Sequence, residues 1–426
     1  MQTNFSLAQL ADPDVAASEQ ILRRCVHCGF CTATCPTFKL LGDELDSPRG
    51  RIYLIKEMLE NERPADARTV RHIDRCLSCL SCMTTCPSGV NYMHLVDHAR
   101  AHIEQTFARP LPERWLRRLL AFVLPRPGLF RIALLGAMAA RPFARLLPGR
   151  LGAMTRMAPA RLPAPSPIDR PQVFPAEGRQ RMRIALLTGC AQTVLDPAIN
   201  EATVRLLTRF GAEVVVAEGA GCCGALVHHM GKTEAARQAA AANIHAWRRA
   251  APDRVVVNAS GCGTQVKDYG YMLRGDPALA ENAAWTSAHT RDLVEVLDEL
   301  GFAARARGSP QTLRIAYHSA CSMQHGQKIT GLPIRLLEAA GFEPLAVPEG
   351  HICCGSAGTY NLLQPDLAGR LGQRKAAHIE STRPDAIAAG NIGCIVQIAN
   401  ATTLPVLHTA QLLDWATGGP RPPRLS

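Results

Sequence analysis

Short apolar runs alternate with longer helical patterns from residue 183 to the end of the chain. The run RIALLTGC (183–190) precedes EATVRLLTRFG (201–211), in which apolar residues recur with the helical period, and the β-rich AEVVVAE (212–218) follows. An alanine-rich helical stretch then leads to the apolar run RVVVNASGCG (254–263). This alternation predicts an α/β layered fold, in which functional loops follow the carboxyl ends of the strands.

The same pattern occurs twice, which indicates an internal duplication. RIALLTGC (183–190) parallels RIAYHSAC (314–321), and each copy carries four cysteines, two of them adjacent and followed by glycine. The spacing from the first cysteine to the adjacent pair is identical in the two copies, and the spacing from the pair to the last cysteine is almost so. We therefore predict two duplicated domains, residues 183–305 and 306–426. Their cysteine sets are Cys190, Cys222, Cys223 and Cys262 in the first and Cys321, Cys353, Cys354 and Cys394 in the second.

A segment of different composition, residues 109–182, precedes the duplicated half. Its apolar runs LLAFVL (119–124) and IALLGAMAA (132–140) are each shorter than the roughly 18 apolar residues that a membrane-spanning helix needs. From Arg114 to Ile168 there are ten arginines and no acidic residue, which account for +10 of the formal net charge of +11. We interpret the segment as a linker. Its helices either pack on the protein's own domains with the arginines in water, or dock on a partner subunit or an anionic membrane.

The composition excludes several classes of protein. With 426 residues, 47% of them hydrophobic and 19% charged, the chain is long enough for two or three globular domains and is not disordered. Sixteen cysteines could form disulfides in a small secreted protein, but this chain is long and its start, MQTNFSLAQLADPDVAASEQ, lacks the basic and apolar regions of a signal peptide. We therefore expect a cytoplasmic, reducing location in which clustered thiols bind metal. The chain shows no basic module interleaved with aromatic residues, so we do not expect it to bind nucleic acid.

The first eight cysteines form two copies of one motif. Residues 25–36 (CVHCGFCTATCP) and 76–87 (CLSCLSCMTTCP) both read C-x2-C-x2-C-x3-C-P, the pattern of ferredoxins with two [4Fe-4S] clusters. In that pattern the fourth cysteine of each motif binds the other cluster. Two four-thiolate zinc sites or free thiols are the alternatives, but a zinc ribbon needs neither the third close cysteine nor the proline. The predicted ligands are Cys25, Cys28, Cys31 and Cys86 for cluster I, and Cys76, Cys79, Cys82 and Cys35 for cluster II.

The two motifs are embedded in a helical domain. The long stretch between them includes SPRGRIYLIKEMLE (47–60), which has a helical pattern. We therefore expect residues 1–108 to form a helical two-cluster ferredoxin domain. The predicted fold class is α+β multidomain: this ferredoxin domain, the basic linker at 109–182, and two duplicated α/β domains, each with a Cys-Cys-Gly (CCG) sequence.

Several segments resemble the iron-sulfur subunits of glycolate oxidase, within a wider group of ferredoxin-plus-CCG proteins. These segments are CVHCGFCTATCPTF (25–38), LDSPRGRIYLIK (45–56), HIDRCLSC (72–79) and TTCPSGVNYMHLVDHAR (84–100), followed by the two CCG repeats. The resemblance implies a subunit of a glycolate dehydrogenase that works with flavin-containing partner chains, which oxidise glycolate to glyoxylate. The clusters then pass electrons to an acceptor such as a quinone or the respiratory chain. If the arginine-rich linker docks on the inner membrane, the contact is expected to be peripheral.

The chain itself is expected to carry electrons without binding the substrate. It has no G-x-G-x-x-G after a predicted strand and no P-loop, so we assign no nucleotide site and no catalytic residue. Equivalent subunits of a lactate or glycerol-3-phosphate dehydrogenase are alternatives, as is a thiol/disulfide enzyme like the heterodisulfide reductases of the same group.

The chemistry of the CCG repeats stays open at this point. Relatives in that group end each copy in C-x-x-C, whereas this chain has ASGC (259–262) and NIGC (391–394), so each repeat offers four cysteines. One or two further iron-sulfur clusters, a structural metal, thiol chemistry at the adjacent pair, or core cysteines are all compatible with this pattern. We assign no role to the nearby histidines, which are His228, His229, His318, His325 and His351.

Overall fold

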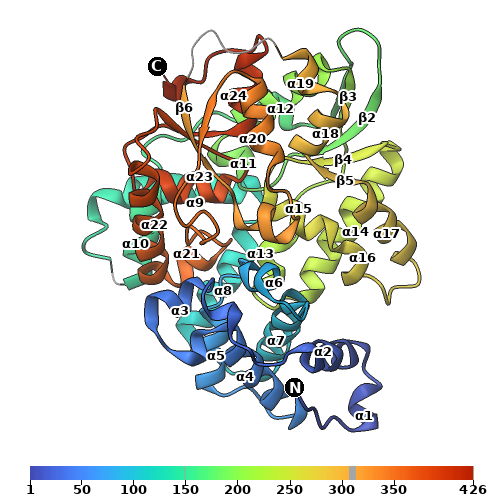
Figure 1. Cartoon of the computed structure of the whole chain (residues 1–426), viewed down its shortest axis with the longest axis vertical. Coiled ribbons are helices and arrows are strands. Elements are labelled where there is room, and N and C mark those ends of the chain that lie inside the picture. The colour runs from blue at the N-terminus through green and yellow to red at the C-terminus, as the bar shows by residue number, and fades with distance from the viewer. Residues whose placement is uncertain (148, 307–312, 426) are drawn as a thin grey trace.

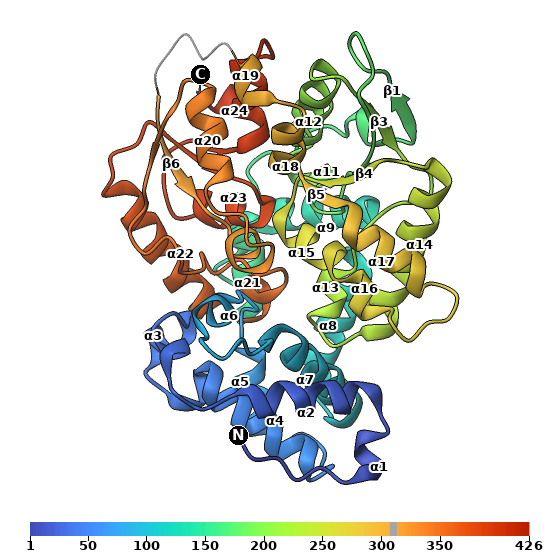
Figure 2. The same cartoon turned by 45° about the vertical axis from the view of Figure 1, so that its right-hand side comes forward.

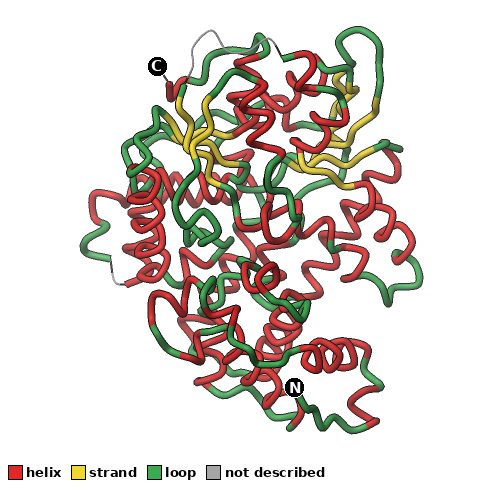
Figure 3. The backbone as a smooth tube through the Cα atoms, in the orientation of Figure 1, coloured by secondary structure: helices red, strands yellow, loops and turns green. Residues whose placement is uncertain are grey.

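The computed structural model describes residues 1–147, 149–306 and 313–425. The N-terminal helices form one end of the molecule, and two α/β halves lie side by side at the other end (Figures 1 and 2). Helices α8 (Leu111–Val123) and α9 (Pro127–Ala140) lie between the two ends. The chain is therefore a mixed helical and stranded protein with its strands confined to the C-terminal part (Figure 3).

The N-terminal domain consists of short helices around an apolar core. Helix α4 starts at Pro48, and Ser47 caps it by accepting a hydrogen bond from the Gly50 amide at 3.0 Å. Its Ile55 packs against Ile73 and Leu95, all fully buried. The helices are α1 (Leu7–Leu10), α2 (Pro13–Arg24), α3 (Pro36–Leu41), α4 (Pro48–Glu60), α5 (Ala67–Asp74), α6 (Ser81–Thr85) and α7 (Tyr92–Thr106), with 3-10 turns at Phe30–Thr32 and Glu44–Asp46.

The linker folds into three helices, α8, α9 and α10 (Gly149–Met157). Unlike the arginines beside it in the helix, Arg117 of α8 is buried. It pairs with Asp74 at 2.9 Å, and Arg109 pairs with the same carboxylate at 2.6 Å. These ion pairs attach the start of the linker to the N-terminal domain. Among the residues described, none of the helices combines the length and the apolar character that crossing a bilayer requires.

The first repeat contains a five-stranded sheet of order β1-β3-β2-β4-β5, parallel except for β1, which pairs antiparallel with β3. Strand β1 belongs to the segment that precedes the repeated sequence, so the linker ends inside this sheet. The strands are β1 (Gln172–Phe174), β2 (Met182–Leu187), β3 (Ala212–Val216), β4 (Arg254–Val257) and β5 (Thr290–Asp292). The helices are α11 (Gln192–Leu195), α12 (Ala198–Arg209), α13 (Ala225–His228), α14 (Thr233–Ala250), α15 (Ser260–Lys267), α16 (Tyr269–Met272), α17 (Ala280–His289), α18 (Leu293–Glu299) and α19 (Phe302–Arg305).

The second repeat contains a parallel four-stranded sheet of order β7-β6-β8-β9, which matches the order β3-β2-β4-β5 of the first. Its strands are β6 (Arg314–His318), β7 (Glu343–Leu345), β8 (Ala386–Ala389) and β9 (Val406–His408). Its helices are α20 (Leu332–Ala339), α21 (Tyr360–Leu363), α22 (Pro365–Glu380), α23 (Ile392–Ala399) and α24 (Thr409–Ala416), with a π-helical turn at Ser322–Gly326.

The two repeats share one hydrophobic core, which includes Leu206 of α12 and Leu413 of α24. Across this interface Arg209 pairs with the buried Asp414 at 2.9 Å, and the His408 Nε2 atom lies 2.7 Å from the Asn258 carbonyl oxygen. The repeats are therefore packed as one body, and the loops that follow their central strands lie in the same region.

Candidate metal centres

Cysteines predicted as ligands of cluster I surround a small cavity. Cys25 follows α2, Cys28 and Cys31 lie in the next turn, and Cys86 comes from the end of α6; all four line the cavity, together with Cys82. The backbone between them is tightly wound, with left-handed conformations at His27 and Gly29. Cys28 is exposed and so is His27, so this centre lies near the surface. The fold thus places Cys86, the fourth cysteine of the second motif, beside the first three cysteines of the first motif.

Cysteines predicted as ligands of cluster II are buried and close to one another. Cys79 lies near Cys35 and Cys76, and Cys82 lies near Cys35, Cys76 and Cys79. Burial, followed by the charges of the neighbouring thiols, raises the pKa of both Cys79 and Cys82 well above the usual range. Four buried thiolates this close need positive charge among them. The donor set therefore fits iron, which would supply that charge.

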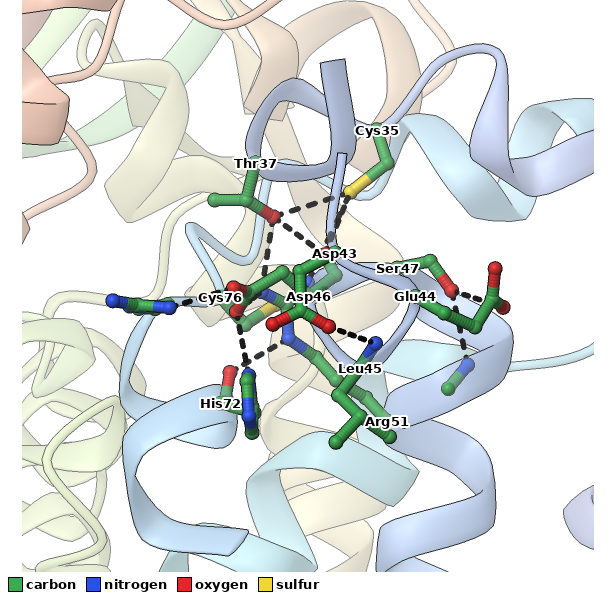
Figure 4. A network of polar contacts seen from close by, with 12 residues as sticks. Cys35, Thr37, Asp43, Glu44, Leu45, Asp46, Ser47, Arg51, His72 and Cys76 are labelled. Atoms are coloured by element: carbon green, nitrogen blue, oxygen red, sulfur yellow. Dashed lines mark hydrogen bonds and ion pairs between the residues drawn. The ribbon is translucent and has the colours of Figure 1, made fainter. Parts of the chain in front are cut away.

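A buried ion-pair network lies beside the cluster II cysteines Cys35 and Cys76 (Figure 4). Asp46, which has no exposed surface, accepts from Arg75 at 2.7 Å, from Arg51 at 3.3 Å, and lies 3.0 Å from the His72 Nδ1 atom. Arg51 also points toward the Cys35 thiol, with Nη1 to Sγ at 3.9 Å. Burial alone would lower the pKa of Arg51, but Cys76 and the other acidic groups around it raise that pKa, so a full positive charge lies beside the cluster ligands.

The four cysteines of the first repeat form a chain of side-chain contacts. Cys222 contacts both Cys190, just beyond β2, and Cys223, which in turn contacts Cys262 in the first turn of α15. Contact with Cys222 and burial raise the pKa of Cys190 and Cys223. Gly224 follows the pair because its φ is +83° and a Cβ there would lie 3.1 Å from the Ala236 oxygen.

The second repeat brings its cysteines together in the same way. The Cys321 and Cys353 sulfurs are 3.8 Å apart, and Cys354 contacts both Cys353 and Cys394. Cys394 lies in the first turn of α23, at the position that Cys262 occupies in α15. Each repeat therefore gathers cysteines that are far apart along the chain into one compact thiol group.

His318 joins the second thiol group, which sequence reasoning did not foresee. Ligand atoms of His318, Cys354 and Cys394 all lie within 4.8 Å of one another. Comparison of the repeats contained the signal, since His318 of RIAYHSAC stands where RIALLTGC has Leu187. Two of the other histidines make hydrogen-bond contacts: His325 lies 2.8 Å from the Thr84 hydroxyl of the ferredoxin domain, and His228 lies 3.1 Å from the Gln265 side-chain oxygen.

The second thiol group lies directly against the ferredoxin domain. Cys79 and Leu77 share a small hydrophobic core with Ile352, Cys353 and Tyr360. The Tyr360 hydroxyl is buried and has no hydrogen-bond partner within the described part of the chain. The cluster II ligands and the second repeat are therefore in side-chain contact.

A large cavity of about 1280 Å³ connects the two repeats with the linker helices. It is lined by cysteines of both repeats, including Cys190, Cys262 and Cys321, and by apolar residues of α8 and α9 such as Leu120 and Leu134. The volume exceeds the roughly 300–1,000 Å³ of ordinary ligand pockets. Cysteines of both repeats thus face one common cavity.

Comparisons with known proteins agree with this arrangement. A 4Fe-4S dicluster domain matches residues 21–90, and a cysteine-rich domain matches residues 184–267 and 315–399. The chain is 43% identical, over 98% of its length and 99% of the relative's, to the glycolate oxidase iron-sulfur subunit of Escherichia coli (strain K12). It is 32% identical, over 93% of its length and 94% of the relative's, to the probable glycolate oxidase iron-sulfur subunit of Bacillus subtilis (strain 168).

Two further similarities are more limited. Lactate utilization protein A of Geobacillus thermodenitrificans is 28% identical over 55% of this chain and 99% of its own length. A hypothetical protein from Helicobacter pylori superimposes with a TM-score of 0.55 over 97% of this chain and 74% of that one, at 9% identity. The second likeness concerns the fold alone.

Proposed function

The chain belongs to the family of glycolate oxidase iron-sulfur subunits, and from this premise we propose that it conducts electrons out of a glycolate-oxidising complex. The observation that carries the proposal is the packing of the cluster II ligand Cys79 with the second repeat and its cysteines. When bound, an iron-sulfur cluster accepts and releases one electron at a time, and a reduced flavin can supply its two electrons singly. The substrate itself is bound by flavin-containing partner subunits.

The proposed ligands divide the eight ferredoxin cysteines between two clusters. Cluster I is held by Cys25, Cys28, Cys31 and Cys86, and cluster II by Cys76, Cys79, Cys82 and Cys35. The shared cavity of the first set and the mutual proximity of the second support this assignment. The sets in the two repeats would hold one or two further clusters.

The experiment that tests the function uses the complex purified anaerobically with its partner subunits. Iron and acid-labile sulfide are counted per chain, and electron paramagnetic resonance follows the clusters after glycolate is added. We expect about eight irons if only the ferredoxin domain is loaded, and about twelve or sixteen if the repeats also hold clusters. Clusters that glycolate does not reduce, or a chain without iron, would overturn the proposal.

Lactate is the second candidate substrate of the complex, because a lactate utilization protein is 28% identical over 55% of this chain. Offering lactate and glycerol 3-phosphate to the same preparation separates the candidates. Reduction of the clusters by lactate or by glycerol 3-phosphate, with glycolate inactive, would assign the chain to that complex.

The face around cluster I is where a flavin subunit would dock. Val26 and Phe30, beside the exposed Cys28, have 66% and 63% of their surface exposed. Apolar side chains exposed next to a redox centre are typical of an interaction site. Electrons would enter here and leave through cluster II, since cluster II ligands face the second repeat.

Replacing Phe30 with aspartate is therefore expected to weaken binding of the flavin subunits by about tenfold or more, the loss typical of a central apolar contact. The matched control is Val173→Asp, at a residue of 51% exposure on strand β1, away from cluster I. Binding is measured by biolayer interferometry under anaerobic conditions. If the Phe30 and Val173 variants bind the flavin subunits with equal affinity, the docking face lies elsewhere.

The outer surface of α8 and α9 fits a peripheral membrane contact. Trp115, Phe122 and Ile132 are each more than half exposed, and arginines such as Arg118 and Arg126 lie among them, over the rings of Trp115 and Phe122. Apolar residues flanked by arginine suit the surface of an anionic membrane. Because the inner side of the same helices lines the large cavity, a lipophilic acceptor such as a quinone would reach the thiol groups from that surface.

Replacing both Trp115 and Phe122 with serine is expected to reduce binding to phosphatidylglycerol vesicles about tenfold or more, because it removes two aromatic anchors. Salt should weaken wild-type binding as well, since the arginine charges are exposed. Sedimentation with vesicles measures both effects. Val173→Ser is the control. Wild-type protein that does not bind such vesicles at low salt would refute the membrane contact.

A further inference from the structure

His318 occupies an unusual position at the end of a central strand. It is the last residue of β6, is 2% exposed, and lies with Cys354 and Cys394 in a group whose ligand atoms are all within 4.8 Å of one another. These three residues come from a strand, a loop and a helix of the second repeat. The fold therefore brings one imidazole and two thiols to a common point.

Neither ring nitrogen of His318 has a hydrogen-bond partner among the described residues. An unsatisfied buried polar group costs about 1–3 kcal/mol, so a native histidine normally finds a partner. His408, at the end of strand β9 in the same sheet, shows the normal case. Its Nε2 lies 2.7 Å from the Asn258 carbonyl oxygen and its Nδ1 accepts from the Ala410 amide at 3.0 Å. The contrast points to a ligand at His318.

We propose that His318 binds an iron of an iron-sulfur cluster in the second repeat, alongside thiolates of the set Cys321, Cys353, Cys354 and Cys394. This inference rests on the proposed function, because it assumes that the second repeat holds a cluster. Coordination would satisfy one nitrogen that the protein leaves unpaired. Imidazole and thiolate are both established ligands of iron in such clusters.

The charge state of the site supports coordination. Lys375 lies near His318. Lys375 is itself buried, and its ammonium group donates to the Glu349 carbonyl oxygen at 2.8 Å. The Lys375 ammonium group also lies near Cys353, Cys354 and Cys394. Its positive charge would offset the negative charge of their thiolates.

The two repeats would then differ in chemistry. The first repeat has Leu187 at the matching place, so its centre can have only thiolate ligands from this group of residues. An imidazole in place of a thiolate removes one negative charge and raises the reduction potential of a cluster. Since the second repeat contacts Cys79, electrons leaving cluster II would pass to a centre that holds them more favourably.

The test uses the full chain, purified anaerobically after growth with ¹⁵N-histidine. Pulsed electron paramagnetic resonance of the reduced protein should show a strongly coupled imidazole nitrogen, because no histidine is proposed as a ligand of clusters I and II. His318→Leu, which copies the first repeat, should lose this coupling completely, and His325→Asn should keep it. His318→Cys should retain the iron while losing the nitrogen signal and lowering the potential of the centre.

Several results would overturn the inference. These are an iron content of about eight per chain in the wild type, zinc in place of additional iron, a wild type without a strong nitrogen coupling, or a coupling that persists in both His318 variants. Glycolate-driven reduction of clusters I and II is recorded on the same protein within its complex. If that reduction remains while the nitrogen signal is absent, only the assignment of His318 fails; if that reduction is lost, the proposed function fails as well.

Discussion

Replacing Cys79 with serine is expected to remove cluster II and to stop electron flow into the second repeat. Cys79 is buried between Cys76, Cys35 and the residues of the second repeat that surround Cys353. Iron should fall by about four atoms per chain. Turnover of the complex with glycolate should fall by more than about 100-fold, since losing even the outer partners of a metal ligand costs roughly 10–100-fold.

The measurement combines iron analysis with rapid-mixing spectroscopy of the purified complex. The control is Met83→Leu, a change of similar volume between Cys82 and Cys86 that removes no proposed ligand. Circular dichroism should show that both repeats remain folded in the Cys79 variant. Normal turnover with the full iron content would mean that Cys79 is not a ligand and that electrons take another route.

Replacing Arg51 with methionine should destabilise the ferredoxin domain by about 3–5 kcal/mol, the usual cost of breaking a buried ion pair. Arg51 is 1% exposed, and its loss leaves Asp46 without one of its buried partners. The Arg51 guanidinium also donates to the Thr37 hydroxyl at 2.9 Å and to the His72 carbonyl oxygen at 2.7 Å, so these groups lose partners too. The stability change is measured by denaturant unfolding under anaerobic conditions.

The same variant should lower the reduction potential of cluster II. The Arg51 charge lies 3.9 Å from the Cys35 sulfur, and a nearby cation favours the reduced, more negative cluster. A redox titration followed by electron paramagnetic resonance measures this shift. Arg291→Gln, which breaks a partly exposed pair with Glu299, is the control and should cost no more than about 1 kcal/mol. An unchanged cluster II potential in Arg51→Met would show that the network has a purely structural role.

Features that depend on local order along the chain can be predicted from the sequence. The two C-x2-C-x2-C-x3-C motifs predict cluster ligands because each set of three cysteines lies within one short loop. The alternation of apolar runs and helical patterns predicts the α/β repeats, and the matching sheets confirm the duplication. Such patterns show which residues are buried and with what period, so they can be recognised without knowledge of the tertiary packing.

Which of these elements come into contact depends on the tertiary packing. Contact between Cys79 and the second repeat, the Asp46 network behind Cys35, and the unpaired His318 beside Cys354 all join residues from separate elements. A metal-binding histidine and an inert core histidine look alike in one sequence, because hydropathy carries no information about neighbours. What distinguishes His318 from His408 is the set of atoms that packing leaves around each ring, and that set exists only in the folded chain.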